Sequence, residues 1–195
     1  MIVTRWAAAV AVCLMAGACT YDTTADPSLT PRDVEFMALI PHATPDRMFA
    51  RYMVDNETGE PPGVIVVETK RKLLFFTMPD GKAMRYGVAL GRESFGWTGE
   101  AVIDHKAEWP DWNPPAEMVA RWPQVHKTAG GPNNPLGARA LYLFQDGKDT
   151  LYRIHGTNEP EKIGRGVSSG CIRMLNIDVI DLYNRAPEGT KVIVR

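Results

Sequence analysis

From Gly63 to its end, the chain is divided into short apolar runs separated by turn-forming residues. Residues 64–68 and 73–78 are almost wholly apolar, which is typical of strands that are buried on both faces. Residues 84–90 alternate large apolar side chains with Arg, Gly and Ala, as a half-buried strand does. Further strands are expected at residues 101–106, 140–145, 151–155 and 191–194. The pattern therefore predicts a mainly β fold.

Helical patterns are few by comparison. Residues 117–122 fit one or two turns, and residues 176–185 fit a helix with Asn176 as its N-cap and Asp178 near its positive end. A short helix is also expected around residues 46–54. Many strands with one or two short helices predict a β-sandwich or a partly closed barrel.

The first 19 residues resemble a secretory signal. Arg5 precedes an apolar run at residues 6–16, and small residues follow it. The run is shorter than the roughly 20 apolar residues that a membrane span needs. The small residues before Cys19 resemble a bacterial lipobox, although Ala16 stands where leucine is most common, and ordinary signal cleavage is the alternative. We therefore expect residues 1–18 to be removed and the protein to be exported to the periplasm, with a membrane anchor on Cys19.

The rest of the chain divides into a tether and one domain. Residues 19–62 are rich in Thr, Asp, Pro and Glu and are predicted to form the lipid-bearing tether. Residues 63–195 suffice for a single domain, and a hydrophobic content of 45% supports a packed core. The chain has 22 Lys and Arg against 23 Asp and Glu, a net charge of −1. Because nucleic-acid binding needs a concentrated basic surface, nucleic acid is excluded as the main partner.

Export and lipidation of Cys19 would leave Cys171 as the one ordinary thiol. This count excludes a disulfide framework and a multi-cysteine zinc site. The histidines other than His155 lack ligand spacing to Cys171, so neither a metal nor another cofactor is expected. A lone thiol in an exported protein is either buried and inert or reactive by design.

His155 and Cys171 stand in a setting that suits nucleophilic chemistry. His155 ends the strand at residues 151–155, on the same face as Arg153. Cys171 follows two serines and Gly170, which allow a sharp turn with neighbouring backbone N–H groups directed at one point. A nucleophilic thiol needs a base and an oxyanion site beside it. Each residue alone also fits a structural role, as a hydrogen-bonded histidine or a small core cysteine.

Four segments form a specific combination: HGTN at residues 155–158, SSGCIRM at 168–174, GPNNPLGARALYL at 131–143, and a closing pattern at 178–192. Together they resemble the catalytic domain of the L,D-transpeptidase family, over residues 63–195. The resemblance implies a β-rich cysteine acyltransferase that acts on peptidoglycan stem peptides. Its expected role is in cell wall biogenesis and cell shape.

In the implied reaction, the Cys171 thiolate attacks the carbonyl of the third residue of a tetrapeptide stem, usually meso-diaminopimelate. The terminal D-alanine leaves, and an amine takes the acyl group to give a 3→3 cross-link, D-amino-acid exchange or an anchored protein. By the resemblance His155 is the base and the Gly156 carbonyl orients its ring. Gly170 and Cys171 supply the oxyanion N–H groups. Three further residues match positions near the substrate: Arg173, Ser168 and Asn158.

Ser169 departs from the family, since many members have histidine there, and this affects local contacts and substrate preference. Arg173 also fits a structural ion pair. Sortases use a similar set of residues on well-separated strands, and NlpC/P60 peptidases place the cysteine before the histidine. A wall-binding lipoprotein with a vestigial site is the non-enzymatic alternative. The sequence does not choose among the three acceptors.

Overall fold

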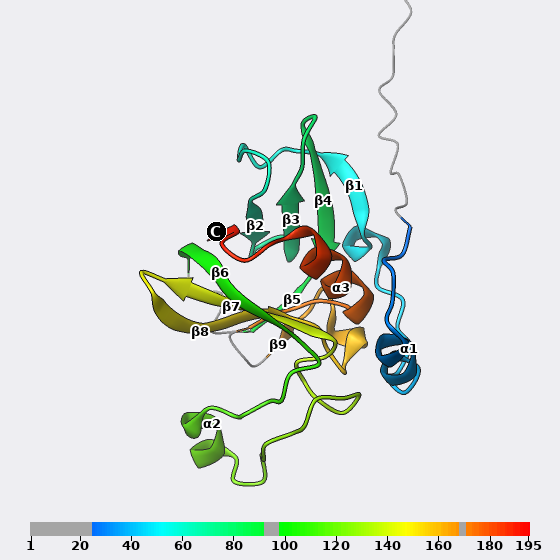
Figure 1. Cartoon of the computed structure of the whole chain (residues 1–195), viewed down its shortest axis with the longest axis vertical. Coiled ribbons are helices and arrows are strands. Elements are labelled where there is room, and N and C mark those ends of the chain that lie inside the picture. Colours follow the sequence, from blue (N-terminus) through cyan, green and yellow to red (C-terminus); the bar gives the residue numbers. More distant parts are fainter. Residues whose placement is uncertain (1–24, 92–97, 168–170) are drawn as a thin grey trace, which may run out of the picture.

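The strands form one large sheet that is not closed into a barrel (Figure 1). The computed structural model describes residues 25–91, 98–167 and 171–195. One half of the sheet consists, in spatial order, of β1 (Tyr52–Asp55), β4 (Lys82–Gly87), β3 (Leu73–Thr77), β2 (Ile65–Glu68) and β11 (Lys191–Val194). The other half continues with β6 (Gly99–Glu108), β7 (Arg139–Gln145), β8 (Lys148–His155), β10 (Ile172–Arg173), β5 (Ala89–Gly91) and β9 (Gly166–Val167). The predicted mainly β fold is confirmed.

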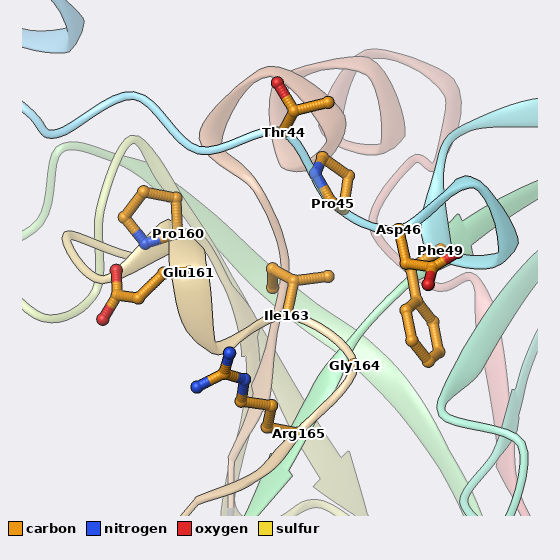
Figure 2. A pocket seen from close by; sticks show the side chains of 9 residues that line it. All are labelled: Thr44, Pro45, Asp46, Phe49, Pro160, Glu161, Ile163, Gly164 and Arg165. Carbon is orange, nitrogen blue, oxygen red and sulfur yellow. The ribbon is translucent and has the colours of Figure 1, made fainter.

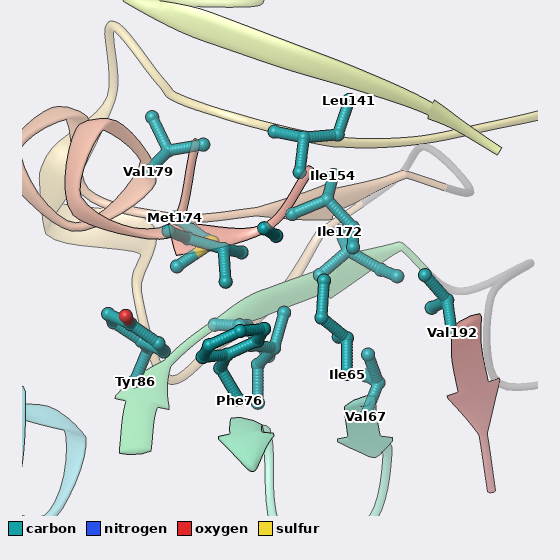
Figure 3. Packing of buried hydrophobic residues seen from close by; sticks show 14 of the residues in the cluster. Ile65, Val67, Phe76, Tyr86, Leu141, Ile154, Ile172, Met174, Val179 and Val192 are labelled. Carbon is teal, nitrogen blue, oxygen red and sulfur yellow. The ribbon is translucent and has the colours of Figure 1, made fainter. Parts of the chain in front are cut away.

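The two halves of the sheet share an apolar core (Figure 3). Ile65 and Val67 enter it from β2, while Ile154 and Ile172 enter it from β8 and β10. The helix α3 (Asn176–Arg185) packs against the same core. Successive side chains of a strand point to opposite faces. The residues next to Ile154 and Ile172 therefore point to the outer face of the sheet.

The strand expected at residues 84–90 is two strands in different halves of the sheet. β4 ends at Gly87 and β5 begins at Ala89. A Cβ on Gly87 would lie 2.3 Å from the Phe49 carbonyl oxygen, so only glycine allows this close approach. The N–H of Val88 donates to the Lys72 carbonyl at 3.0 Å. Alternation did not reveal the division because the apolar period continues across it, and the short strands β1, β9 and β10 were not predicted.

The helices are short, as expected. They are α1 (Pro31–Met37), α2 (Ala116–Arg121), α3, and the 3-10 turns η1 (Arg47–Phe49) and η2 (Pro160–Lys162). The bounds of α3 match the prediction, but the prediction of Asn176 as its N-cap is wrong. Leu175 occupies that position without a side-chain cap, because the Asn176 side chain binds backbone groups outside the helix. Within the described ranges, no helix is long and apolar enough to cross a membrane.

Residues 25–55, here called the N-terminal segment, pack on the domain and are not a spacer (Figure 1). α1 begins with Pro31 and a capping box between Thr30 and Asp33, and β1 pairs with β4. The helix expected around residues 46–54 is η1 followed by β1. The tether prediction is therefore wrong for this segment, because its prolines and polar residues cap and start structure. The predicted signal and Cys19 lie outside the described residues.

Candidate active site

Parallel pairing of β8 and β10 sets His155 and Arg173 side by side. Their register joins Ile154 to Ile172 and His155 to Arg173. Because both isoleucines enter the core, the second pair lies on the outer face of the sheet. Cys171 comes two residues before Arg173 and is therefore placed diagonally across from His155 on this same face. The topology thus brings the two residues singled out from the sequence to one place.

His155 is held in one tautomer by its neighbour. Its side chain is buried, and Nδ1 lies 2.7 Å from the carbonyl oxygen of Gly156. A carbonyl only accepts a hydrogen bond, so Nδ1 carries the proton and Nε2 keeps its lone pair. Burial, with the nearby Arg173 guanidinium adding to it, lowers the pKa of His155 to about 3. The ring is therefore neutral at physiological pH and can accept a proton at Nε2.

The Cys171 thiol is also neutral at rest. Burial raises its pKa, while a backbone hydrogen bond from Arg153 and the charges of Arg153 and Arg173 counteract only part of that effect. A resting imidazolium–thiolate pair would require the imidazole to have the higher pKa of the two. The directions here are the reverse. Any attack by this sulfur would therefore have to be accompanied by transfer of its proton to a base.

Arg173 is engaged in an ion pair. Its Nη1 lies 3.2 Å from Oε2 of Glu159, and its side chain is 13% exposed. Glu159 also binds the ammonium group of Lys162. The structural role considered for Arg173 is thus present, and a substrate contact by Arg173 stays a prediction. The ion pair links β10 to the loop that follows His155.

Arg153 is a further charged group beside the thiol, and it shares the face of His155 as the alternation predicted. It makes a bidentate pair with Asp149 at 2.7 Å for both contacts, and its guanidinium lies 4.5 Å from the centre of the Tyr142 ring. Tyr142 in turn stacks on His105. Sequence reasoning placed Arg153 on this face but gave it no role. Both of its Nη groups are bonded to Asp149, so its influence on Cys171 comes from its charge and its backbone.

Asn176 fixes the loop that carries Gly156, a role that sequence reasoning missed. Its Oδ1 accepts from the N–H groups of Ala138 at 2.9 Å and Thr157 at 3.1 Å, and its Nδ2 donates to the Thr157 carbonyl at 2.8 Å. A Cβ on Gly156 would lie 2.2 Å from that Oδ1, which explains the glycine. The polar side chain at the start of α3 was a signal, but its partners are far away in the sequence.

The other predicted site residues divide into two groups. Asn158 donates to the Asn133 carbonyl at 3.2 Å and so joins the loop after His155 to the loop before β7. Its contact with substrate stays a prediction. Ser168, Ser169 and Gly170 lie outside the described residues, and the oxyanion role of Gly170 stays a prediction with them.

A pocket of about 220 Å³ lies between the N-terminal segment and residues 160–165 (Figure 2). Phe49 and Pro45 form one wall, and Pro160 and Ile163 form the other. Neither His155 nor Cys171 lines it. The Phe49 ring lies so close to Gly164 that a Cβ there would come within 2.2 Å of it. The N-terminal segment therefore packs tightly on the stretch that leads toward Cys171.

The fold and this face define a class of protein: an open β fold that presents a neutral imidazole and a lone thiol on one side of its sheet. Residues 62–194 match the family model of the L,D-transpeptidase catalytic domain, YkuD. The Bacillus subtilis protein YqjB, which is named among the L,D-transpeptidases, is 38% identical over 142 residues, 71% of this chain and 75% of YqjB. The chain therefore belongs to the L,D-transpeptidase catalytic domain family.

Solved structures show the same fold. A Brucella melitensis protein named as a probable carnitine operon oxidoreductase is 45% identical, with a TM-score of 0.54 over 77% of this chain and 96% of that chain. L,D-transpeptidase 3 of Mycobacterium tuberculosis has a TM-score of 0.52 at 16% identity, over 68% of this chain and 60% of that one. The chain spans about half the length of the first curated relatives that it matches, 49% and 43%.

Proposed function

We propose that this protein is an L,D-transpeptidase with Cys171 as its nucleophile and His155 as its base. The observation that carries the proposal is the hydrogen bond from His155 Nδ1 to the Gly156 carbonyl, 2.7 Å long. It leaves the basic Nε2 on the face that also holds Cys171. Family membership and the family's action on peptidoglycan support the choice of substrate.

In the first half-reaction, Sγ of Cys171 attacks the carbonyl carbon of the third stem residue while its proton passes to His155 Nε2. The imidazolium that forms is stabilised by the Gly156 carbonyl. Backbone N–H groups of residues 170 and 171 would hold the oxyanion. When the peptide C–N bond breaks, Nε2 returns the proton to the departing D-alanine amine, and a thioester remains on Cys171.

In the second half-reaction, an acceptor amine attacks the thioester carbonyl and gives a proton to Nε2. The C–S bond breaks, and the sulfur leaves with that proton as the free thiol. The acceptor is a stem diaminopimelate, a D-amino acid or a protein amine, and the same acyl-enzyme serves all three. The mechanism uses this chain's own residues alone.

The test is a mass-spectrometric assay of the purified protein with tetrapeptide muropeptides and each candidate amine. We expect release of D-alanine and a product with the acceptor attached. Cys171→Ala should give neither product, and Cys19→Ser, the matched cysteine variant, should keep the activity. Product formed by Cys171→Ala at the wild-type rate would contradict the assignment. A thiol-specific carbapenem adduct of the wild-type protein reports on acylation alone.

We further propose that the protein is exported and anchored through a lipid on Cys19, on the strength of residues 1–19. Five residues separate Cys19 from Ala25, where the packed N-terminal segment begins. An extended chain of that length spans about 20 Å, so the anchor would hold the domain next to the bilayer. A diacylglyceryl mass on Cys19 and partition into detergent are expected. A soluble periplasmic protein without added lipid would instead show ordinary signal cleavage.

A further inference from the structure

The N-terminal segment lies outside the range of the family match, residues 62–194. It is nevertheless bonded to Arg139, whose carbonyl binds the backbone next to His155. Its most buried polar residue is Asp33, which is 0% exposed although it carries a carboxylate. A buried charge is tolerated only with full hydrogen bonding and a counter-charge. The partners of Asp33 therefore indicate what this segment is attached to.

Asp33 is saturated with hydrogen bonds. Its Oδ1 accepts from Trp109 Nε1 and from Arg139 Nη1, both at 2.8 Å. Its Oδ2 accepts from Arg139 Nη2 at 2.9 Å and from the N–H and hydroxyl groups of Thr30 at 3.0 and 2.8 Å. Burial alone would raise the pKa of Asp33, but the bonds from Arg139, Thr30 and Trp109 hold it well below its usual range. The pair with Arg139 is therefore charged.

The pair of Asp33 and Arg139, here called the clamp, is connected to His155 through the backbone of Arg139. The Arg139 carbonyl accepts from the Gly156 N–H at 3.0 Å, and the Gly156 carbonyl accepts from His155 Nδ1 at 2.7 Å. The same guanidinium donates to the Ala138 carbonyl at 2.8 Å, which fixes the start of β7. One residue, Gly156, thus binds the Arg139 carbonyl through its N–H and the imidazole through its own carbonyl.

We propose that Asp33 is a positioning residue for His155. Asp33 holds Arg139, and the Arg139 carbonyl holds the backbone of Gly156, which binds the imidazole. The inference rests on the proposed function, because it concerns the base of that reaction. Asp33 touches no reacting atom. The N-terminal segment thereby belongs to the catalytic unit, which begins before residue 31 instead of at residue 63.

The experiment compares Asp33→Asn with Asp26→Asn in the full chain. Asp26 is a matched control, since it belongs to the same segment and pairs with Arg51 at 2.8 Å but is exposed. The readouts are the rate of carbapenem acylation at Cys171 from pH 5 to 9, and the affinity for a tetrapeptide stem measured in a Cys171→Ala background. All are taken at a temperature where each variant is shown to be folded.

For Asp33→Asn we expect acylation to fall at least tenfold, with tetrapeptide affinity unchanged within twofold. The loss should be similar at every pH from 5 to 9, because His155, with a pKa of about 3, stays neutral throughout this range. Asp26→Asn should match the wild-type protein in all readouts. A folded Asp33→Asn protein with wild-type acylation across this pH range would overturn the proposal.

A second variant covers the case in which Asp33→Asn does not fold. Arg139→Lys keeps a positive charge opposite Asp33 but loses the two-pronged contact, so a threefold to tenfold loss of acylation is expected. Wild-type rates in this variant would overturn the proposal as well. If the wild-type protein itself is not acylated, the proposed function and this inference fall together. Normal acylation of every variant would refute the inference alone.

Discussion

Two buried polar centres lie next to each other in this fold and differ in how completely they are bonded. The clamp of Asp33 and Arg139 is charged, and both carboxylate oxygens are fully used. The pair of His155 and Cys171 is neutral, and Nε2 of the imidazole is left with its lone pair. The difference separates a carboxylate whose oxygens are already bonded from an imidazole whose Nε2 can still accept a proton.

The largest effect on the acylation rate should come from a substitution in the pair of His155 and Cys171. Replacement of His155 by Ala removes the acceptor at Nε2, and we expect acylation to slow by about 10²–10⁴-fold, the usual scale of positioned proton transfer. Stopped-flow fluorescence with a carbapenem measures the rate, with circular dichroism as the control for folding. A loss under about threefold in a folded protein would mean that another group is the base.

A substitution in the clamp of Asp33 and Arg139 should lower the stability of the fold instead. Arg139→Met leaves the Asp33 carboxylate buried and unpaired, which should cost about 3–5 kcal/mol in the free energy of unfolding. The double variant Asp33→Leu/Arg139→Met removes both charges and should cost less than the single variant. Urea unfolding followed by fluorescence measures both. If the double variant is the less stable of the two, the clamp is not dominated by its unpaired charge.

Lowering the pH should reduce the free energy of unfolding through His155 but not through Asp33. In the unfolded chain His155 titrates near 6.5, but in the fold its pKa is about 3. As the pH falls below 6.5, the unfolded state binds a proton that the folded state does not, so the free energy of unfolding drops. The expected drop from this residue at pH 5 is about 2 kcal/mol.

The measurement is urea unfolding at pH 7.5 and pH 5 for the wild-type protein and for His155→Gln, which does not titrate. The difference between the two pH values should be smaller in the variant by about the amount expected from His155. Asp33, whose pKa lies well below its usual range, stays ionised in this window and adds nothing to the change. Parallel behaviour of the two proteins would contradict the neutral, buried state of His155.

The smallest effect is expected at Ser169. Serine does not usefully accept a proton near neutral pH, so Ser169→Ala should retain acylation within about tenfold, or about 1.4 kcal/mol. Ser169→His should not restore activity to His155→Ala, because the proposed base lies at the end of β8. Recovery of near wild-type acylation in that double variant would show that a second position in this fold can supply the base.

The sequence predicted those features that depend on local periodicity. Alternation in residues 151–155 placed His155 and Arg153 on one face, and the apolar runs located most strands. Long-range partners were not predicted. Asp33 lies 106 residues from Arg139, and no local pattern in a segment rich in proline and threonine indicates such a contact.

Asn176 is a second residue whose distant partners the sequence did not predict. A helix-capping rule uses the next few residues only, and it assigned this side chain to its own helix. Its actual partners, Thr157 and Ala138, lie 19 and 38 residues away and offer buried backbone groups that have to be bonded. The fold determined the choice between a local and a distant partner. The contact of His155 with the adjacent Gly156 carbonyl was expected only from the resemblance to the family.

The raised pKa of Cys171 also bears on how long the protein lasts. Oxidants such as peroxides react with thiolates, and a thiol kept protonated offers them little to attack. In the oxidising compartment proposed for this protein, the sulfur would resist conversion to sulfenic acid and mixed disulfides between turnovers. It would become strongly nucleophilic only when a carbonyl and the imidazole engage it together, so the burial that lowers its resting reactivity also preserves it.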